Sequence, residues 1–227
     1  MSGIVEQALM FAKKCHEGDN SGHDFEHIQR VMANAEKILM EEPLADAQAV
    51  RVAVALHDVD DYKLGSDGAR AKSFLSEIGV QEDFAKKVLN IVSSIGFSKS
   101  GSHPHFQMIE QAIVSDADKL DAVGAIGVCR TIMYSATTKR PLFDEQIFPD
   151  ENLTSEQYQN KNRATNHAIN HFFDKLLKLK GAMQTKVGKM EAEKRHLFMI
   201  AFLREFFDEV RADEWQEYLD KFLKRTA

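Results

Sequence analysis

The stretch LHDVDDYK, Leu56 to Lys63, places one histidine beside three aspartates, directly after the apolar run AVRVAVA. A buried, unpaired carboxylate costs several kcal/mol, so Asp58 requires a compensating charge. A salt bridge to a nearby Lys or Arg is one explanation. A divalent cation is the other, because it would stabilise the carboxylate and also bind the lone pair of a neutral His57. The pair therefore favours a metal site.

Other ligands would have to come from distant parts of the chain. His27 lies beside the apolar face of a predicted helix, where a lone histidine is more often a core residue. Asp118 lies in VSDADKLDAVG, where three carboxylates are flanked by apolar residues on both sides. Taken singly, neither residue indicates a site. Taken with His57 and Asp58, they form a set of acids and imidazoles that lie in apolar surroundings on separate helices, which is the pattern expected of a shared site.

The order of these four residues resembles the H…HD…D signature of the HD-domain metal-dependent phosphohydrolases. The similarity extends to a subfamily of small, single-domain bacterial HD hydrolases through the blocks GHDFEHIQRV, LHDVDDYK, SDADKLDAVGAIGVCR and NHFFDKLLKLK. The resemblance implies that His27, His57, Asp58 and Asp118 hold one divalent ion. Mn²⁺ or Mg²⁺ is favoured, with Fe²⁺, Co²⁺ and Ni²⁺ as further candidates, since the pattern holds no cysteine that would single out zinc.

The number of metal ions depends on histidines between the HD pair and the last aspartate. HD proteins with two metals use extra histidines in this interval. Here it holds only His103 and His105, which flank Pro104 in a predicted surface loop. A single metal is therefore favoured, and the oxygenase members of the superfamily, which need two irons, are disfavoured.

Residues near the predicted metal are candidates for catalysis. Asp61 follows Asp58 by three positions, so the two carboxylates share a face if the helix continues for one more turn. Asp61 would then exchange a proton near the metal-bound water; its alternative is a turn or capping residue. Asp61, His57 and Asp58 form the predicted catalytic set. His23, one turn before His27, is a candidate substrate contact.

An anionic substrate at an acidic site needs cationic donors. Lys139 and Arg140, a charge pair in a predicted loop, have a plainer explanation as solvated charges, and Lys119 could offset the acidic cluster. Asp121 is explained as a cap of a helix from Ala122 onward. The family resemblance suggests that His171 and Lys175 approach the active-site cleft. The candidate substrate-binding residues, besides His23, are Lys119, Arg130, Lys139, Arg140, His171 and Lys175.

Helical periodicity extends nearly throughout the chain, so the sequence predicts an all-α fold. An HD-domain helical bundle with a C-terminal helical extension is expected, as a single domain over residues 1–227 with a core of about 20–135 and C-terminal helices at about 154–224 packed on it. A helix is expected to begin just after Asp118. Two long C-terminal helices and a last short one are expected. The other predicted helices cover residues 2–15, 23–42, 45–57, 69–78 and 82–95, of which 45–57 is the central buried one.

Composition narrows the functional classes. The chain has 227 residues, 44% hydrophobic and 28% charged, with a net charge of −6 and no basic block, which argues against nucleic acid as a partner. No apolar run approaches the roughly 20 residues that span a bilayer. Cys15 and Cys129 are expected to be idle thiols in a reducing cytosol. The protein is therefore expected to be cytoplasmic, without a membrane partner, and the sequence does not indicate its oligomeric state.

The leading hypothesis is a metal-dependent phosphohydrolase that binds a small phosphorylated substrate, a nucleotide. Its expected reaction converts a nucleoside triphosphate to a monophosphate and pyrophosphate. A phosphomonoesterase acting on nucleoside monophosphates or other small phosphate esters is the alternative. An HD-type oxygenase and a non-catalytic helical binding module are alternatives of a different class.

Overall fold

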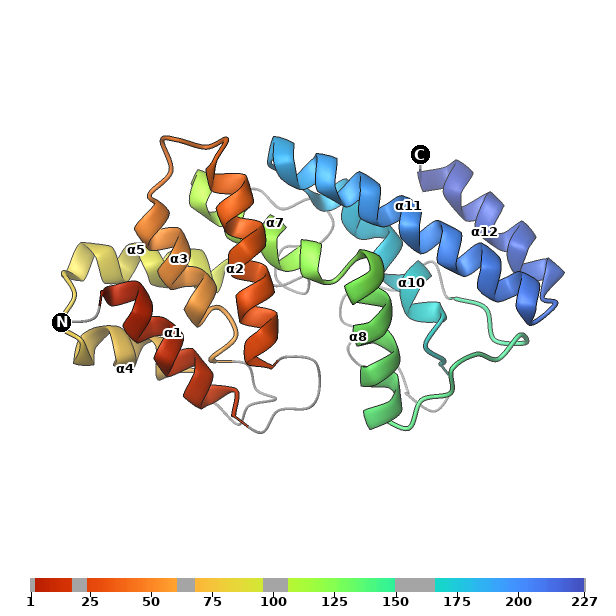
Figure 1. The fold of residues 1–227 in the computed structure, drawn as a ribbon, viewed down its shortest axis with the longest axis horizontal. Helices are drawn as coiled ribbons and strands as arrows, with labels where there is room; N and C mark the ends of the chain where they lie inside the picture. Colours follow the sequence, from red (N-terminus) through yellow and green to blue (C-terminus); the bar gives the residue numbers. More distant parts are fainter. Residues whose placement is uncertain (1–2, 18–23, 61–67, 96–105, 150–165, 227) are drawn as a thin grey trace. The chain divides into compact units, whose positions relative to one another are not determined.

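The computed structural model describes residues 3–17, 24–60, 68–95, 106–149 and 166–226. All regular structure in these ranges is helical, which confirms the predicted all-α fold (Figure 1). The chain divides into two compact units. Unit 1 comprises Met1–Asp121 with Met183–Gly188, and unit 2 comprises Ala122–Ala182 with Lys189–Ala227. The single-domain arrangement stays a prediction. None of the helices in the described ranges has the length and apolar character needed to cross a bilayer.

Unit 1 is built around one central helix, α3. This helix contacts α1, α2, α5 and α7, and its residues from Val52 to Leu56 are fully inaccessible to solvent. The prediction of a central buried helix is therefore confirmed. The helices of unit 1 are α1 (Ile4–Cys15), α2 (Phe25–Leu39), α3 (Ala47–Leu56), α4 (Arg70–Glu77), α5 (Glu82–Ser93) and α7 (Ile109–Asp121).

Carboxylates accept backbone N–H groups at the start of three of these helices. The Asp24 carboxylate accepts the backbone N–H of His27 at 2.8 Å, and Asp46 caps α3 in the same way. Asp60 accepts the backbone N–H groups of Arg70 and Ala71, at the start of α4. A carboxylate at a helix N-terminus satisfies free backbone donors and lies at the positive end of the helix dipole. The cap at Asp24 thus sets the first turn of α2, which carries His27.

The expectation of a helix beginning just after Asp118 is wrong. Helix α7 already includes Asp118 and ends at Asp121, and a separate helix, α8 (Gly124–Thr137), follows. Val123 is extended and Gly124 has φ +75°, a conformation that glycine adopts readily and that interrupts the helix. Asp118 therefore lies in the last turn of α7.

Unit 2 contains α8, a short α10 (Asn170–Asp174), a 3₁₀ helix η3 (Leu176–Ala182), most of α11 (Lys186–Glu209), and α12 (Asp213–Thr226). The prediction of a long first C-terminal helix is wrong, because the backbone at Lys175 (φ −139°) leaves the helical region after five residues. The core of unit 2 is aromatic. Trp215 is buried and donates its indole N–H to the Glu145 carbonyl at 2.9 Å. The rings around it belong to Phe143, Phe148, His167, Phe173, Phe207 and Tyr218.

Candidate metal centre

Three helices of unit 1 bring the four predicted metal ligands together. His27 comes from the first turn of α2, His57 and Asp58 from the turn directly after α3, and Asp118 from the last turn of α7. Asp58 Oδ2 lies 3.4 Å from Nε2 of each histidine. Asp118 Oδ1 lies 3.6 Å from Nε2 of His27 and 3.8 Å from Nε2 of His57. The residues that are far apart in the sequence thus form one cluster.

The cluster has a buried side and an open side. The imidazoles of His27 and His57 are each 1% exposed, whereas the carboxylates of Asp58 and Asp118 are 18% and 30% exposed. The burial follows from the helices, because α3 runs through the core and α2 and α7 pack against it and against each other. A substrate would therefore approach from the side of the carboxylates.

Hydrogen bonds orient both imidazoles toward the centre of the cluster. His57 Nδ1 lies 2.8 Å from the carbonyl oxygen of Val54. A carbonyl only accepts, so Nδ1 carries the proton and Nε2 of a neutral ring keeps its lone pair. His57 Nε2 is buried and makes no hydrogen bond within the described part of the chain. His27 Nδ1 is likewise engaged, at 2.7 Å from Asp121 Oδ2, with Nε2 directed at Asp58 and Asp118.

The spacing of these acceptor atoms fits a shared cation. Separations of 3.4–3.8 Å are longer than a charge-assisted hydrogen bond, which is about 2.7–2.9 Å. Ligands that surround one divalent ion at about 2.0–2.2 Å lie roughly 3–3.5 Å apart. Atoms of His27, His57 and Asp118 also lie within 4.8 Å of one another. Two imidazole nitrogens and two carboxylates suit a divalent ion of the first transition row, and the carboxylates suit Mg²⁺ as well.

Asp121 does not have the role expected from the sequence. The expected cap of a helix from Ala122 onward is not formed, because Asp121 ends α7 and points to α2. Its carboxylate accepts the Nε–H of Arg30 at 2.7 Å and an Nη2–H at 3.2 Å, besides its contact with His27. Arg30 is not among the residues predicted for the site. Arg30 could have been identified from its position in the sequence. It follows His27 by three residues, and residues three apart on a helix share a face.

Lys119 is buried within unit 1, although it is adjacent to the partly exposed Asp118. Its ammonium donates to the Ser115 hydroxyl and lies 5.9 Å from the centre of the Phe106 ring. Burial lowers the pKa of Lys119, while the charges of Asp118 and Asp116 act in the opposite direction. The Lys119 side chain therefore lies inside unit 1, next to the acidic end of α7.

The other described candidates for substrate binding lie in unit 2. Arg130 is a half-buried residue of α8, and Lys139 is exposed in a left-handed conformation (φ 54°) just after that helix. Burial lowers the pKa of His171 to about 3, and the charges of Lys175 and Arg140 act in the same direction. His171 is therefore neutral at physiological pH, and the charges that could attract a phosphate here belong to Lys175 and Arg140.

The depressed pKa of His171 predicts a pH-dependent loss of stability. The unfolded chain takes up a proton near pH 6.5 and the folded chain only near pH 3, so acidification through this window favours unfolding. Between pH 7 and pH 5 the contribution is up to about 2 kcal/mol. We expect the unfolding free energy of His171→Asn, from urea titrations, to fall less than that of the parent across this range. An equal fall in both proteins would contradict the assignment.

Two predicted residues, Asp61 and His23, lie outside the described residues. The condition set for Asp61, that α3 continues for another turn, is not met. The helix ends at Leu56, and residues 57–60 form turns, with the Val59 N–H bonded to the Leu56 carbonyl at 3.3 Å. The catalytic role of Asp61 stays a prediction that rests on its proximity to Asp58 in the sequence.

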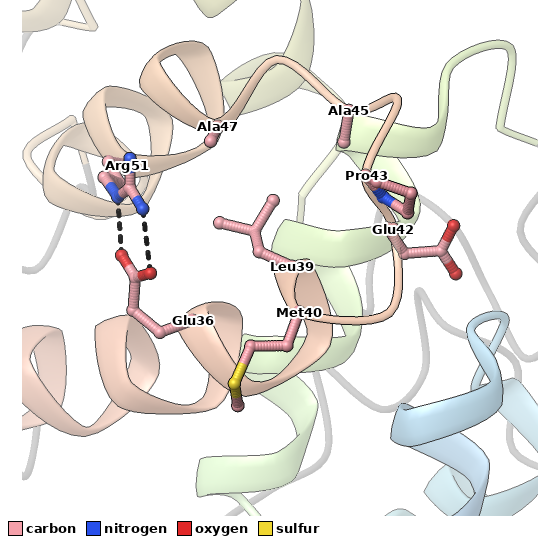
Figure 2. Close-up of a pocket in the computed structure, with 8 residues that line it drawn as sticks. All are labelled: Glu36, Leu39, Met40, Glu42, Pro43, Ala45, Ala47 and Arg51. Atoms are coloured by element: carbon pink, nitrogen blue, oxygen red, sulfur yellow. Dashed lines mark hydrogen bonds and ion pairs between the residues drawn. The ribbon is translucent and has the colours of Figure 1, made fainter.

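A surface cavity of about 220 Å³ lies between the end of α2 and the start of α3 (Figure 2). Its polar wall is a two-point pair, in which Arg51 donates to Glu36 at 2.6 and 2.9 Å. The cavity contains none of the four clustered ligands, so we place the chemistry at the cluster. The remaining lining residues are Leu39, Met40, Glu42, Pro43, Ala45 and Ala47.

Comparison with known proteins identifies related chains. The family model of the HD domain matches residues 24–123, a range that contains the four predicted ligands. YpgQ of Bacillus subtilis is 32% identical over 210 residues, covering 88% of this chain and 91% of YpgQ. A structure of YpgQ in complex with ADP has a TM-score of 0.67 at 28% identity, with 91% of this chain and 97% of that chain covered.

Two further solved structures are similar. A protein from Lactobacillus plantarum has a TM-score of 0.81 at 33% identity, covering 92% of this chain and 97% of its own. A protein from Bacillus thuringiensis, described as an HD-superfamily hydrolase, has a TM-score of 0.70 at 35% identity, with the same coverage of both chains. These similarities extend well beyond the four ligands, over nearly the whole length of the chain.

Proposed function

Since the chain belongs to the HD-domain superfamily, we propose that it is a metal-dependent phosphohydrolase that acts on nucleotides. The single observation that carries the proposal is the convergence of His27, His57, Asp58 and Asp118, in which Nε2 of each histidine lies 3.4–3.8 Å from an oxygen of each aspartate. We propose that these four residues bind one divalent ion.

A divalent ion bound there would activate a water molecule and polarise a phosphoryl group. The chain supplies the orientation. His57 is held by the Val54 carbonyl and His27 by Asp121, so both rings keep Nε2 directed to the centre. The more exposed Asp118 and Asp58 face the side from which substrate would enter. The burial of both imidazoles limits access of bulk water from the side of the core.

Nucleotides are the proposed substrate class for two reasons. YpgQ, similar over most of its length, has been solved in complex with ADP. This chain also carries the cations predicted from the sequence, and within unit 2 Arg130, Lys139, Arg140 and Lys175 are at least partly accessible. Guanidinium and ammonium groups bind phosphate oxygens through charge-assisted hydrogen bonds, and a triphosphate offers more such oxygens than a monoester.

The proposed reaction cleaves the anhydride bond between the α- and β-phosphates. Water forms a bond to the α-phosphorus, and the bridging oxygen leaves with the β- and γ-phosphates as pyrophosphate. We expect the enzyme, incubated with deoxynucleoside triphosphates and Mn²⁺ in ¹⁸O-water, to produce ¹⁸O-labelled monophosphate and unlabelled pyrophosphate. Ion-exchange chromatography separates the products, and mass spectrometry measures the label in each.

Substrate analogues provide the control for this reaction. A β,γ-methylene triphosphate should be cleaved, whereas an α,β-methylene triphosphate should resist. Release of inorganic phosphate and nucleoside from monophosphates, with triphosphates untouched, would contradict the proposal and identify a phosphomonoesterase.

A further inference from the structure

Helices α2 and α7 each present two polar residues three positions apart to the same contact. His27 and Arg30 come from α2, and Asp118 and Asp121 come from α7. His27 and Asp118 face the ligand cluster, with His27 Nε2 3.6 Å from Asp118 Oδ1. Arg30 and Asp121 meet on the other side of His27. Behind the pair of His27 and Asp118 therefore lies an ion pair of Arg30 and Asp121, which contacts His27 through Asp121.

The carboxylate of Asp121 uses both oxygens. Oδ1 accepts the Nε–H of Arg30 at 2.7 Å, while Oδ2 accepts the Nη2–H of Arg30 at 3.2 Å and lies 2.7 Å from His27 Nδ1. Asp121 is buried, with its side chain 2% exposed. Both oxygens of Asp121 act as acceptors toward Arg30, so its contact with His27 is a hydrogen bond in which the ring donates from Nδ1. The lone pair of the ring is then on Nε2, which points at the cluster.

We propose that Asp121, itself held by Arg30, is a positioning residue that fixes His27 in the Nδ1–H tautomer and so prepares Nε2 to bind the metal. The inference rests on the proposed function. Metal-ligating histidines commonly donate their second ring N–H to a carboxylate, and loss of that partner typically lowers metal affinity about 10- to 100-fold.

Arg30 makes the effect of an amide at position 121 predictable. In Asp121→Asn, the carbonyl oxygen is expected to take the Oδ1 position, because the bond from Arg30 Nε at 2.7 Å is shorter and stronger than that from Nη2 at 3.2 Å. The amide NH₂ then occupies the Oδ2 position and donates to His27 Nδ1. The ring must carry its proton on Nε2, the atom that would bind the metal.

The experiment compares the ring tautomer and the metal affinity. Metal-free protein labelled with ¹⁵N is studied by ring ¹⁵N–¹H correlation, with the His27 signals assigned from their absence in His27→Asn. Mn²⁺ affinity is measured by calorimetry. We expect Nδ1–H in the parent, Nε2–H in Asp121→Asn, and an affinity about 10- to 100-fold lower in that variant. In Asp121→Asn/Arg30→Met the amide can rotate, so Nδ1–H and part of the affinity should return.

A matched control exists on α2, the helix that carries His27. Glu36→Gln changes a carboxylate of α2 that is held by a similar two-point pair, with Arg51, outside the cluster. It should leave the His27 tautomer and the Mn²⁺ affinity unchanged. The inference is overturned if Asp121→Asn keeps Nδ1–H, or if its affinity falls and the double variant does not recover. Absence of Mn²⁺ binding in the parent would instead refute the proposed function, while the tautomer in metal-free protein would still test the role of Asp121.

Discussion

Replacement of Asp118 or Asp58 by alanine is expected to abolish both metal binding and hydrolysis while the fold persists. Asp58 and Asp118 are the two carboxylates of a cluster whose other members are imidazoles, so the loss of either aspartate removes half of the anionic groups that would hold a dication. Charge stabilisation by a bound metal is worth several kcal/mol, so the rate should fall at least about 1,000-fold. Mn²⁺ content by elemental analysis and the rate of product release measure the two effects.

The fold is expected to persist because the four acceptor groups repel one another without a cation. Removing one carboxylate should leave the helical circular dichroism unchanged and should leave or raise the thermal midpoint of the metal-free protein. Asp83→Ala, which changes an exposed acid of α5, is the control and should keep the parent rate. A rate near that of the parent in either ligand variant would mean that the metal site is wrongly assigned.

Replacement of Asp116 by alanine is expected to cost the largest amount of stability. Asp116 is fully buried in α7, two residues before Asp118. Its carboxylate accepts the backbone N–H groups of Gln184 and Thr185 at 3.0 and 2.7 Å and the Thr185 hydroxyl at 2.8 Å. Alanine would remove the acceptor of the buried Thr185 N–H and hydroxyl and of the part-buried Gln184 N–H. We expect the unfolding free energy, from urea titration, to fall by about 3–5 kcal/mol.

Milder variants test the same contact. Burial raises the pKa of Asp116, and Asp116→Asn retains one acceptor, so asparagine should cost less than alanine. Gly188→Ala should also be destabilising, because a Cβ there would lie 2.4 Å from Asp116 Oδ2. Equal stability of Asp116→Ala and the parent would show that the carboxylate does not hold residues 184–185 to α7.

The four residues of the cluster could be predicted to lie together because each stands out from apolar surroundings in the sequence. His57 and Asp58 follow a helix that is apolar on nearly every side, and α3 is indeed the central helix of unit 1. A carboxylate placed beside an imidazole directly after an apolar helix indicates a need for a charge partner, and this can be recognised from the residue types and their apolar neighbours. The order of His27, His57, Asp58 and Asp118 then indicates the family.

Features that depend on a single backbone residue or on a contact between helices could not be predicted. The helix break at Gly124 separates α7 from α8, yet glycine also occurs within helices, as at Gly127. Asp121 resembles a cap in the sequence because its partners, His27 and Arg30, are more than 90 positions away. Only the packing of α2 against α7 brings them together.

The most direct test of the account is a titration of metal-free protein with Mn²⁺, with hydrolysis of a deoxynucleoside triphosphate followed at each step. The account predicts no hydrolysis without metal, a rise in proportion to added Mn²⁺, and a plateau at one ion per chain, with the rise absent in Asp118→Ala. A plateau at two ions would contradict the single-metal site. Hydrolysis that persists after chelation, or no hydrolysis of any nucleotide at full occupancy, would contradict the proposed function itself.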